Sequence, residues 1–173
     1  WLMALAAEPA IAELRPFSRT TVAGLNGLVA NFSENDSKKI KDIETETNHD
    51  VKAIEYWLKA RLGKNREVRG ALEFIHFAAT SEDINNLAYA LMLAESRRRV
   101  MLPKLDELVA VLRAAAHRHA ALAMLSRTHG QPASPTTLGK ELANVVARLR
   151  RARARIAAVS LLGKKNGAVG NYH

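Results

Sequence analysis

A chain of 173 residues with 48% hydrophobic and 25% charged residues is long enough for a domain with its own core, and this composition is typical of globular proteins. Aromatic residues make up only 5%, while alanine, leucine and arginine are plentiful, which favours helices over sheets. The absence of cysteine excludes disulfides and thiolate metal sites and fits a reducing cytoplasm. The longest unbroken apolar run, residues 87–94, is far too short to span a bilayer, so no membrane partner is expected.

The net charge of +9 arises from 26 lysines and arginines against 17 acidic residues. Such a balance fits either a nucleic-acid partner or a small anionic substrate. The densest basic stretch lies between residues 148 and 155, and no aromatic residue interleaves with its arginines. This pattern is more typical of a solvated helix face than of a platform for stacked bases, so nucleic acid is the weaker alternative.

Helical patterns fill the first part of the chain, and we expect helices over residues 1–14, 18–31, 33–48 and 50–62. Ser18 is a good N-cap for the second helix, and Ser33-x-x-Asp36 is a capping box at the start of the third. In the fourth, the spacing of apolar residues after Asp50 is that of an amphipathic helix. A loop is expected over residues 63–66, followed by a short apolar segment over residues 71–79.

A second capping box, Thr80-x-x-Asp83, opens a long helical pattern that runs on from Ile84. Pro103 is expected to kink this helix or to divide it. A polar turn over residues 126–132 follows between two long helices, which would present His129 at a helix junction. The last helix carries an apolar seam with alternating steps of four and three residues: Leu138, Leu142, Val145, Leu149, Ala152, Ile156 and Val159.

These patterns predict an all-α fold in which long helices form a bundle. A seam this regular favours packing against other long helices, so we expect an oligomer. The chain begins with Trp1 and stops after a short polar stretch that ends at His173, which predicts a piece of a longer protein.

Three polar clusters interrupt the helical pattern at expected helix boundaries, over residues 47–50, 80–83 and 126–132. Taken singly, the first two have a structural explanation, because Asp50 is an ordinary N-cap residue and the second cluster is a capping box. Yet N–H groups at a helix start also bind carboxylate or phosphate, and the hydroxyls of Thr80 and Ser81 would help. His129 in the third cluster is either a hydrogen-bonded loop residue or a functional one.

The other histidines are weaker candidates. His76 lies in an apolar run and is expected in the core, whereas His117 and His119 are expected at the surface. Because these two are spaced i, i+2, they do not share a helix face and make a poor metal pair. The sequence contains no metal-ligand motif, glycine-rich phosphate loop or nucleophile elbow, so neither a metal nor a cofactor is predicted.

Taken together, the clusters resemble those of the aspartase/fumarase superfamily. Their amino-acid sequences are similar to those of the bacterial type of the adenylosuccinate lyase family. Four stretches in the same order and spacing carry the resemblance: TNHDVKA at residues 47–53, TSEDINNL at 80–87 within the segment 73–93, SRTHGQPA at 126–133 and GAVGN at 167–171. The resemblance implies a small helical domain over residues 1–79. It also implies that residues 80–173 form the first long helices of the central bundle of a homotetramer.

The activity implied by the resemblance is a β-elimination that releases fumarate from adenylosuccinate and from the related succinyl-aminoimidazole carboxamide ribotide of purine biosynthesis. His129 corresponds to the family's general acid, and an imidazole suits that task because its ordinary pKa of about 6.5 lies near working pH. Asn48, His49 and Asp50 match a substrate-binding segment, and Thr80 and Ser81 match a pair that contacts the succinyl group. Further candidates on the same grounds are His76, Thr128 and Gln131.

The family's general base is a serine on a flexible loop, and its signature is absent from this sequence. Because each active site of the family combines residues from three subunits, we expect these 173 residues alone to be inactive. Two alternatives stay open. One is another fumarate-releasing lyase of the superfamily, such as argininosuccinate lyase or fumarase. The other is a basic helical module that binds nucleic acid through Arg148, Arg150, Arg151, Arg153 and Arg155, although it gives no reason for the three polar clusters.

Overall fold

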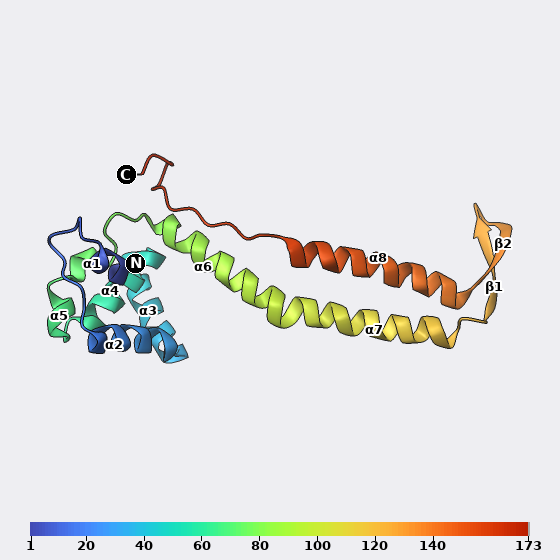
Figure 1. The fold of residues 1–173 in the computed structure, drawn as a ribbon, viewed down its shortest axis with the longest axis horizontal. Helices are drawn as coiled ribbons and strands as arrows, with labels where there is room; N and C mark the ends of the chain where they lie inside the picture. The colour runs from blue at the N-terminus through green and yellow to red at the C-terminus, as the bar shows by residue number, and fades with distance from the viewer. Residues whose placement is uncertain (173) are drawn as a thin grey trace. The chain divides into compact units, whose positions relative to one another are not determined.

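The computed structural model describes residues 1–172, and the chain divides into two compact units. Unit 1 comprises residues 1–87 and the segment from residue 164 onwards, and unit 2 comprises residues 88–163. Among the described residues, every regular element is helical except for one two-stranded sheet (Figure 1). The predicted helical fold class is therefore confirmed, whereas the sheet was not predicted. The division into domains after residue 79 stays a prediction about the longer protein.

Unit 1 is built from short helices and the start of a longer one. They are α1 Leu2–Ala7, α2 Arg19–Ala30, α3 Glu34–Thr47, α4 Asp50–Leu62, α5 Arg66–Arg69, the 3-10 helix η1 Leu72–Phe74 and the first residues of α6 Ser81–Ser96. The helix expected over residues 1–14 is wrong beyond Ala7. Pro9 disfavours the helical conformation at the residue before it, and Glu8 is accordingly extended, with φ −83° and ψ 113°. The loop expected over residues 63–66 ends one residue early, because Arg66 already belongs to α5.

The predicted caps of α2 and α3 are confirmed. The Ser18 hydroxyl accepts the Thr21 N–H at 3.2 Å. At the start of α3 the Ser33 hydroxyl accepts the Asp36 N–H, and the Asp36 carboxylate accepts the Ser33 N–H in return. Both arms of that capping box satisfy N–H groups that would otherwise lack a partner at the helix start.

Apolar faces of the short helices form two small cores in unit 1. One joins Leu5, Ala6, Leu14 and Ala71, and the other joins Ile40 of α3 to Ala53 and Trp57 of α4. Glu55 on α4 is also buried. Its burial raises the pKa, but hydrogen bonds from Lys52 and Lys59 outweigh this effect, so the pKa of Glu55 lies below its usual value. The carboxylate is thus held ionised beside the core.

Unit 2 contains the remainder of α6, which continues without a break into α7 Leu102–Arg118 through a π-helical turn, Arg97–Met101. In this turn the Leu102 N–H reaches back five residues to the Arg97 carbonyl. Pro103 follows directly. Because proline lacks an N–H and its ring crowds the carbonyl four residues earlier, the wider turn accommodates it. The expected disturbance at Pro103 is therefore present as a local change of helix type.

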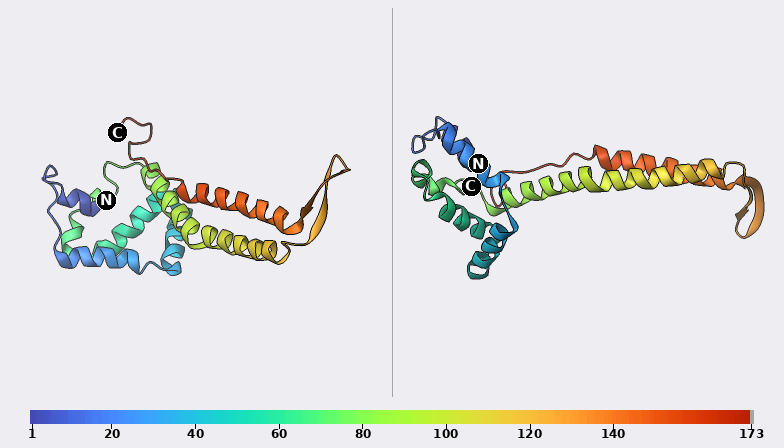
Figure 2. Two further views of the ribbon diagram at one scale, coloured as in Figure 1. Left: turned by 45° about the vertical axis from the view of Figure 1, so that its right-hand side comes forward. Right: turned by 90° about the horizontal axis from the view of Figure 1, so that it is seen from below.

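The helices α7 and α8 Leu138–Ala158 lie side by side in unit 2 (Figures 1 and 2). Arg153 of α8 forms a bidentate pair with Asp106 of α7, with N–O distances of 2.9 and 2.8 Å. The predicted seam is correct for Leu138, Leu142, Leu149 and Ile156, which are half-buried. It is wrong for Val145, Ala152 and Val159, which are exposed, and Val159 lies one residue beyond the end of α8. Val146, next to Val145, is buried instead.

The polar turn expected between two long helices is instead the tip of a β-hairpin. Strand β1 Ala123–Thr128 pairs antiparallel with β2 Gln131–Thr137, and Thr128 is paired with Gln131. The two loop residues, His129 and Gly130, have φ values of 52° and 77°, as a type I′ hairpin turn requires. Pro132 and Pro135 lie within β2, and neither is compatible with a helix interior. The prediction of helices flanking this turn directly is therefore wrong.

A close backbone contact brings the start of α8 onto the end of α7. The Gly139 N–H donates to the His119 carbonyl at 3.0 Å, and a Cβ at residue 139 would lie under 3.0 Å from backbone atoms of Ala116 and Ala120. Only glycine fits here without moving the backbone.

Replacing Gly139 with alanine is therefore expected to lower the free energy of unfolding by about 2–3 kcal/mol, as other overpacked sites do. Gly24→Ala on α2 is the matched control, because a Cβ there meets nothing within 4 Å. The control should leave stability unchanged or raise it by up to about 1 kcal/mol. Chemical denaturation measures the free energy of unfolding of both variants. If Gly139→Ala were as stable as the parent, the close backbone approach at Gly139 would be contradicted.

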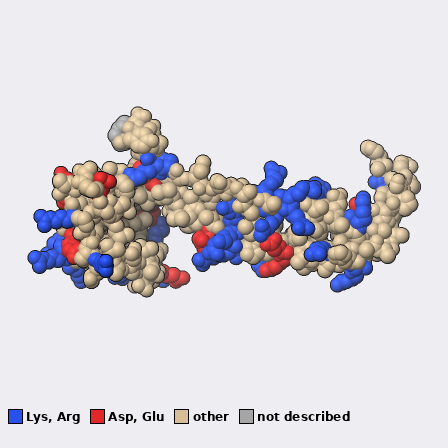
Figure 3. Space-filling model, in the orientation of Figure 1, with Lys and Arg blue, Asp and Glu red and all other residues tan. Residues whose placement is uncertain are grey.

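Lysine and arginine side chains gather along α7 and α8 in the space-filling view (Figure 3). One of the arginines predicted to form a basic face, Arg153, is engaged by Asp106. Within residues 1–172, no helix has both the length and the apolar character needed to cross a membrane.

Candidate active site

The second polar cluster lies at the N-terminus of α6, in unit 1. Its centre is Asp83, whose exposed fraction is 1%. The Asp83 carboxylate accepts the Thr80 N–H at 3.0 Å, which is one arm of the predicted capping box. Ser81 is the first residue of the helix, so its N–H and hydroxyl lie at the positive end of the helix dipole.

Asp83 also holds a segment from the far end of the chain. Its carboxylate accepts from the Lys164 ammonium at 2.9 Å, the Asn166 N–H at 3.1 Å and the Gly167 N–H at 3.3 Å. Asn86, one turn further along α6, exchanges two hydrogen bonds with the backbone of Lys164, at 2.8 and 3.1 Å. The segment 164–167 is thereby fixed against the first turn of α6.

These contacts keep Asp83 ionised although it is buried. The Thr80 N–H, together with the Lys164 ammonium and the Asn166 N–H, outweighs the effect of burial and holds the pKa of Asp83 far below its usual value. The sequence predicted only a capping role for Asp83. Its ion pair with Lys164 was not predicted. No signal in the sequence pairs these residues, because they are 81 positions apart.

The first polar cluster lies at the N-terminus of α4. Asn48 takes the left-handed conformation, with φ 50°, and ends α3. His49 is then the N-cap of α4, and Asp50, which we expected to be the cap, is the first helical residue. The His49 Nδ1 accepts the Lys52 N–H at 3.3 Å. The imidazole therefore performs the capping task that serine, threonine, aspartate or asparagine usually performs.

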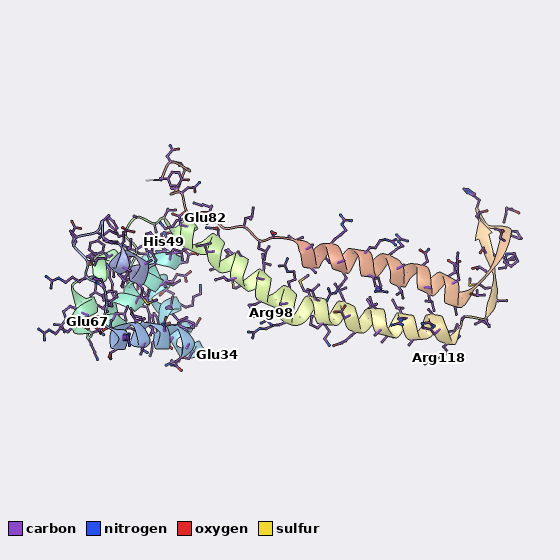
Figure 4. The ribbon with its side chains drawn as sticks, in the orientation of Figure 1. Glu34, His49, Glu67, Glu82, Arg98 and Arg118 are labelled. Carbon is purple, nitrogen blue, oxygen red and sulfur yellow. The ribbon has the colours of Figure 1, made fainter. Side chains whose placement is uncertain are left out.

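Two side-chain contacts join the first and second clusters. His49 Nε2 lies 3.3 Å from the Ser81 hydroxyl, and Asn85 donates to the Asp50 carboxylate at 2.9 Å. Figure 4 labels His49 and Glu82, which lie near each other at the starts of α4 and α6. The hydrogen bond from Asn85, followed by that from the Val51 N–H, lowers the pKa of Asp50. The structure thus gathers His49, Asp50 and Ser81 in one place.

A cavity of about 480 Å³ opens at Thr80, next to the start of α6. It is lined by Ala78, Ala79, Thr80, Lys165, Asn166, Gly167 and Tyr172. The Lys165 ammonium lies 3.7 Å from the centre of the Trp1 ring and donates to the Ala78 carbonyl at 2.7 Å. The volume of this cavity suits a small molecule. Because Lys165 lies beside a helix start, an anionic molecule is favoured.

The third polar cluster belongs to unit 2. His129 occupies the tip of the β-hairpin, where its side chain is exposed, and Thr128 and Gln131 flank it as the last pair of the ladder. Arg127 donates weakly to the Gly130 carbonyl, at 3.5 Å. An exposed imidazole on a two-residue turn is available to a ligand or to another chain. Sequence reasoning thus found a turn here but placed it between helices.

His76 lies in unit 1 and is half-buried, in the turns that follow η1. The expectation that His76 lies in the core is therefore not met, and within residues 1–172 its ring makes no hydrogen bond. In the same part of the chain, no group of three or more histidine, aspartate and glutamate side chains is placed to hold a metal ion.

The comparison with solved structures shows which known proteins share this helical fold. The fold is similar to that of a fumarate lyase from Mesorhizobium sp. BNC1, with a TM-score of 0.75 and 23% identity over 99% of this chain and 38% of that one. A 3-carboxy-cis,cis-muconate lactonizing enzyme from Pseudomonas putida has a TM-score of 0.72 and 25% identity, over 98% of this chain and 38% of that one.

The model of the lyase family matches residues 1–173, and the chain therefore belongs to this family. Among curated proteins it is 52% identical to an adenylosuccinate lyase of Haemophilus influenzae and 50% identical to that of Escherichia coli K12, in both cases over the whole of this chain. The resemblance predicted from the motifs is thereby confirmed. The chain spans 38% of the length of these relatives.

Proposed function

We propose that the protein to which this chain belongs is an adenylosuccinate lyase. The observation that carries the proposal is identity of 52% over all 173 residues to a protein of that name, a span that includes all three polar clusters. The geometry supports it, because a helix start with the hydroxyls of Thr80 and Ser81, near Lys165, suits a substrate that carries several carboxylates and a phosphate.

In the proposed reaction, a base outside this chain removes a proton from the carbon next to a carboxylate. The electron pair left on that carbon is stabilised by the carboxylate and then forms the double bond of fumarate as the carbon–nitrogen bond breaks. His129 donates a proton to the departing nitrogen as general acid. Thr80 and Ser81 hold the succinyl portion, and the segment of Asn48, His49 and Asp50 lines the same site. His76, Thr128 and Gln131 are further candidates for contacts.

The proposal includes a homotetramer with active sites shared between subunits and a cytoplasmic location, which fits the cysteine-free sequence. Because the proposed base is supplied from outside residues 1–173, this chain alone should release no fumarate.

A panel of three substrates tests the proposal on the full-length parent. We expect fumarate from adenylosuccinate and none from argininosuccinate or malate, measured by absorbance and by the stoichiometric appearance of AMP. The isolated chain is the control and should be inactive. Fumarate from argininosuccinate or malate alone would identify a different lyase of the same fold, and fumarate from the isolated chain would contradict the sharing of sites.

A further inference from the structure

The positive charge of the chain is concentrated in unit 2. Residues 88–163 contain 13 lysines and arginines against 4 acidic residues, an excess of nine positive charges. Unit 1 contains 13 residues of each sign, so its formal charge is zero. The net charge of +9 therefore lies entirely in unit 2, where basic side chains gather along α7 and α8 (Figure 3). A charge this unevenly distributed favours a polyanionic ligand for unit 2.

Four basic side chains of unit 2 line one groove between α7 and α8. We propose that this groove binds an elongated polyphosphate of at least three phosphate groups. The groove has a volume of about 460 Å³, and its basic residues are Arg113 and His117 of α7 with Lys140 and Arg150 of α8. None of the residues that line it is acidic. The proposal goes beyond the function proposed above and does not depend on it, because binding is measured without the substrate of that reaction.

The groove has an uncharged floor and a basic rim. The two basic residues on α7 are about one turn apart, so they project from the same face of that helix. All four basic residues are exposed, whereas three other lining residues are buried: Ala116, Gly139 and Val146. The close backbone approach at Gly139 brings the two helices together beneath the cations. A ligand in the groove can therefore contact side chains of both helices.

Three of the four cations are unengaged. Within residues 1–172, the side chains of Arg113, His117 and Arg150 form neither a hydrogen bond nor an ion pair. Lys140, by contrast, lies 3.0 Å from the Glu141 carboxylate. A guanidinium group binds phosphate oxygens through paired, charge-assisted hydrogen bonds. The two unengaged arginines are therefore expected to make the principal contacts with the ligand.

The spacing of the cations determines the size of the ligand. Lys140 and Arg150 are ten residues apart on α8, which corresponds to about 15 Å along the helix axis. A single phosphate group reaches only part of such a row, whereas a linear triphosphate spreads its charges along it. No aromatic side chain lines the groove, so a nucleobase would have no ring on which to stack. The phosphate chain itself is therefore the group that the groove recognises.

Titration calorimetry of the full-length parent with tripolyphosphate, and separately with orthophosphate at equal ionic strength, tests the proposal. Tripolyphosphate should bind with a Kd at least about 10-fold below that of orthophosphate. Arg113→Gln and Arg150→Gln should each raise the Kd for tripolyphosphate by about 10- to 100-fold, because each removes a charge-assisted contact. Arg148→Gln is the matched control. Arg148 is an exposed arginine of α8 outside the groove, so its Kd should change by no more than about twofold.

An equal loss of affinity in Arg148→Gln would show that the ligand responds only to the overall charge of unit 2, and would overturn the proposal. It would also be overturned if the parent bound orthophosphate as tightly as tripolyphosphate, or bound neither. Thermal unfolding gives a second readout. Saturating tripolyphosphate should raise the Tm of the parent by several degrees and leave that of the double variant, Arg113→Gln with Arg150→Gln, unchanged. An equal rise in both would place the ligand outside the groove.

Discussion

Replacing His129 with alanine in the full-length protein is expected to lower kcat for adenylosuccinate by a factor of about 10²–10⁴, with little change in KM. This is the size of effect that loss of a general acid produces. Stability should not change, because the His129 side chain is exposed at the tip of the hairpin and no contact of its ring holds β1 to β2. The measurement is steady-state kinetics of the purified variant beside its thermal unfolding.

His117→Ala provides the control for this prediction. His117 is an exposed histidine of α7 outside the three polar clusters, so its removal should leave kcat within about twofold of the parent. If His129→Ala retained the parent's kcat while the control behaved as expected, His129 would have no role in proton transfer, although the substrate assignment could still hold.

Replacing Asp83 with alanine is expected to lower the free energy of unfolding by about 1–3 kcal/mol, because half-buried donors lose the buried carboxylate that accepts from them. The variant leaves the Lys164 ammonium and the N–H groups of Asn166 and Gly167 without their acceptor. The segment 164–167 should then detach from α6 and become sensitive to proteases. Denaturant unfolding and limited proteolysis measure the two effects, and Asp42→Ala, at an exposed position of α3, is the control.

The pH dependence of stability follows from the same residue. Because the pKa of Asp83 is lowered in the folded protein, the unfolded chain binds its proton first as the solution is acidified. The contribution of Asp83 is therefore complete above about pH 4, the ordinary pKa of an aspartate, and is lost progressively below it. Between about pH 4 and 2 the parent should lose stability more steeply than Asp83→Ala. If the free energy of unfolding fell equally steeply with pH in the parent and in Asp83→Ala, the assignment of Asp83 as an ionised, buried carboxylate would be wrong.

The parts of the fold that depend on neighbouring residues could be predicted from the sequence. The caps at Ser18 and Ser33 were correct because a side-chain acceptor three residues before its donor is a local signal. The disturbance before Pro103 was foreseen for the same reason. The switch from Asp50 to His49 as the cap of α4 was missed, because histidine is rarely a cap and the left-handed Asn48 decides which residue comes last before the helix.

Features that depend on distant residues could not be predicted. Alanine and leucine around residue 123 favour helix, and only pairing with β2 turns residues 123–128 into a strand, so the hairpin was missed. Val146 rather than Val145 is buried because the close approach at Gly139 sets which face of α8 meets α7. For the candidate site, the sequence indicated the residues of all three clusters. The contact of His49 with Ser81 and the bond of Asp83 to Lys164 needed the structure.

The central claim is that the polar cluster of unit 1 and His129 of unit 2 serve one kind of active site, and complementation between two inactive full-length variants tests it most directly. One variant carries His129→Ala and the other carries Thr80→Ala with Ser81→Ala. If a site draws these parts from different subunits, about a quarter of the sites in mixed tetramers carry no substitution. We predict that activity returns to about that fraction after joint refolding. Two affinity tags verify that mixed tetramers have formed. If these tetramers were as inactive as either variant alone, the claim would be contradicted.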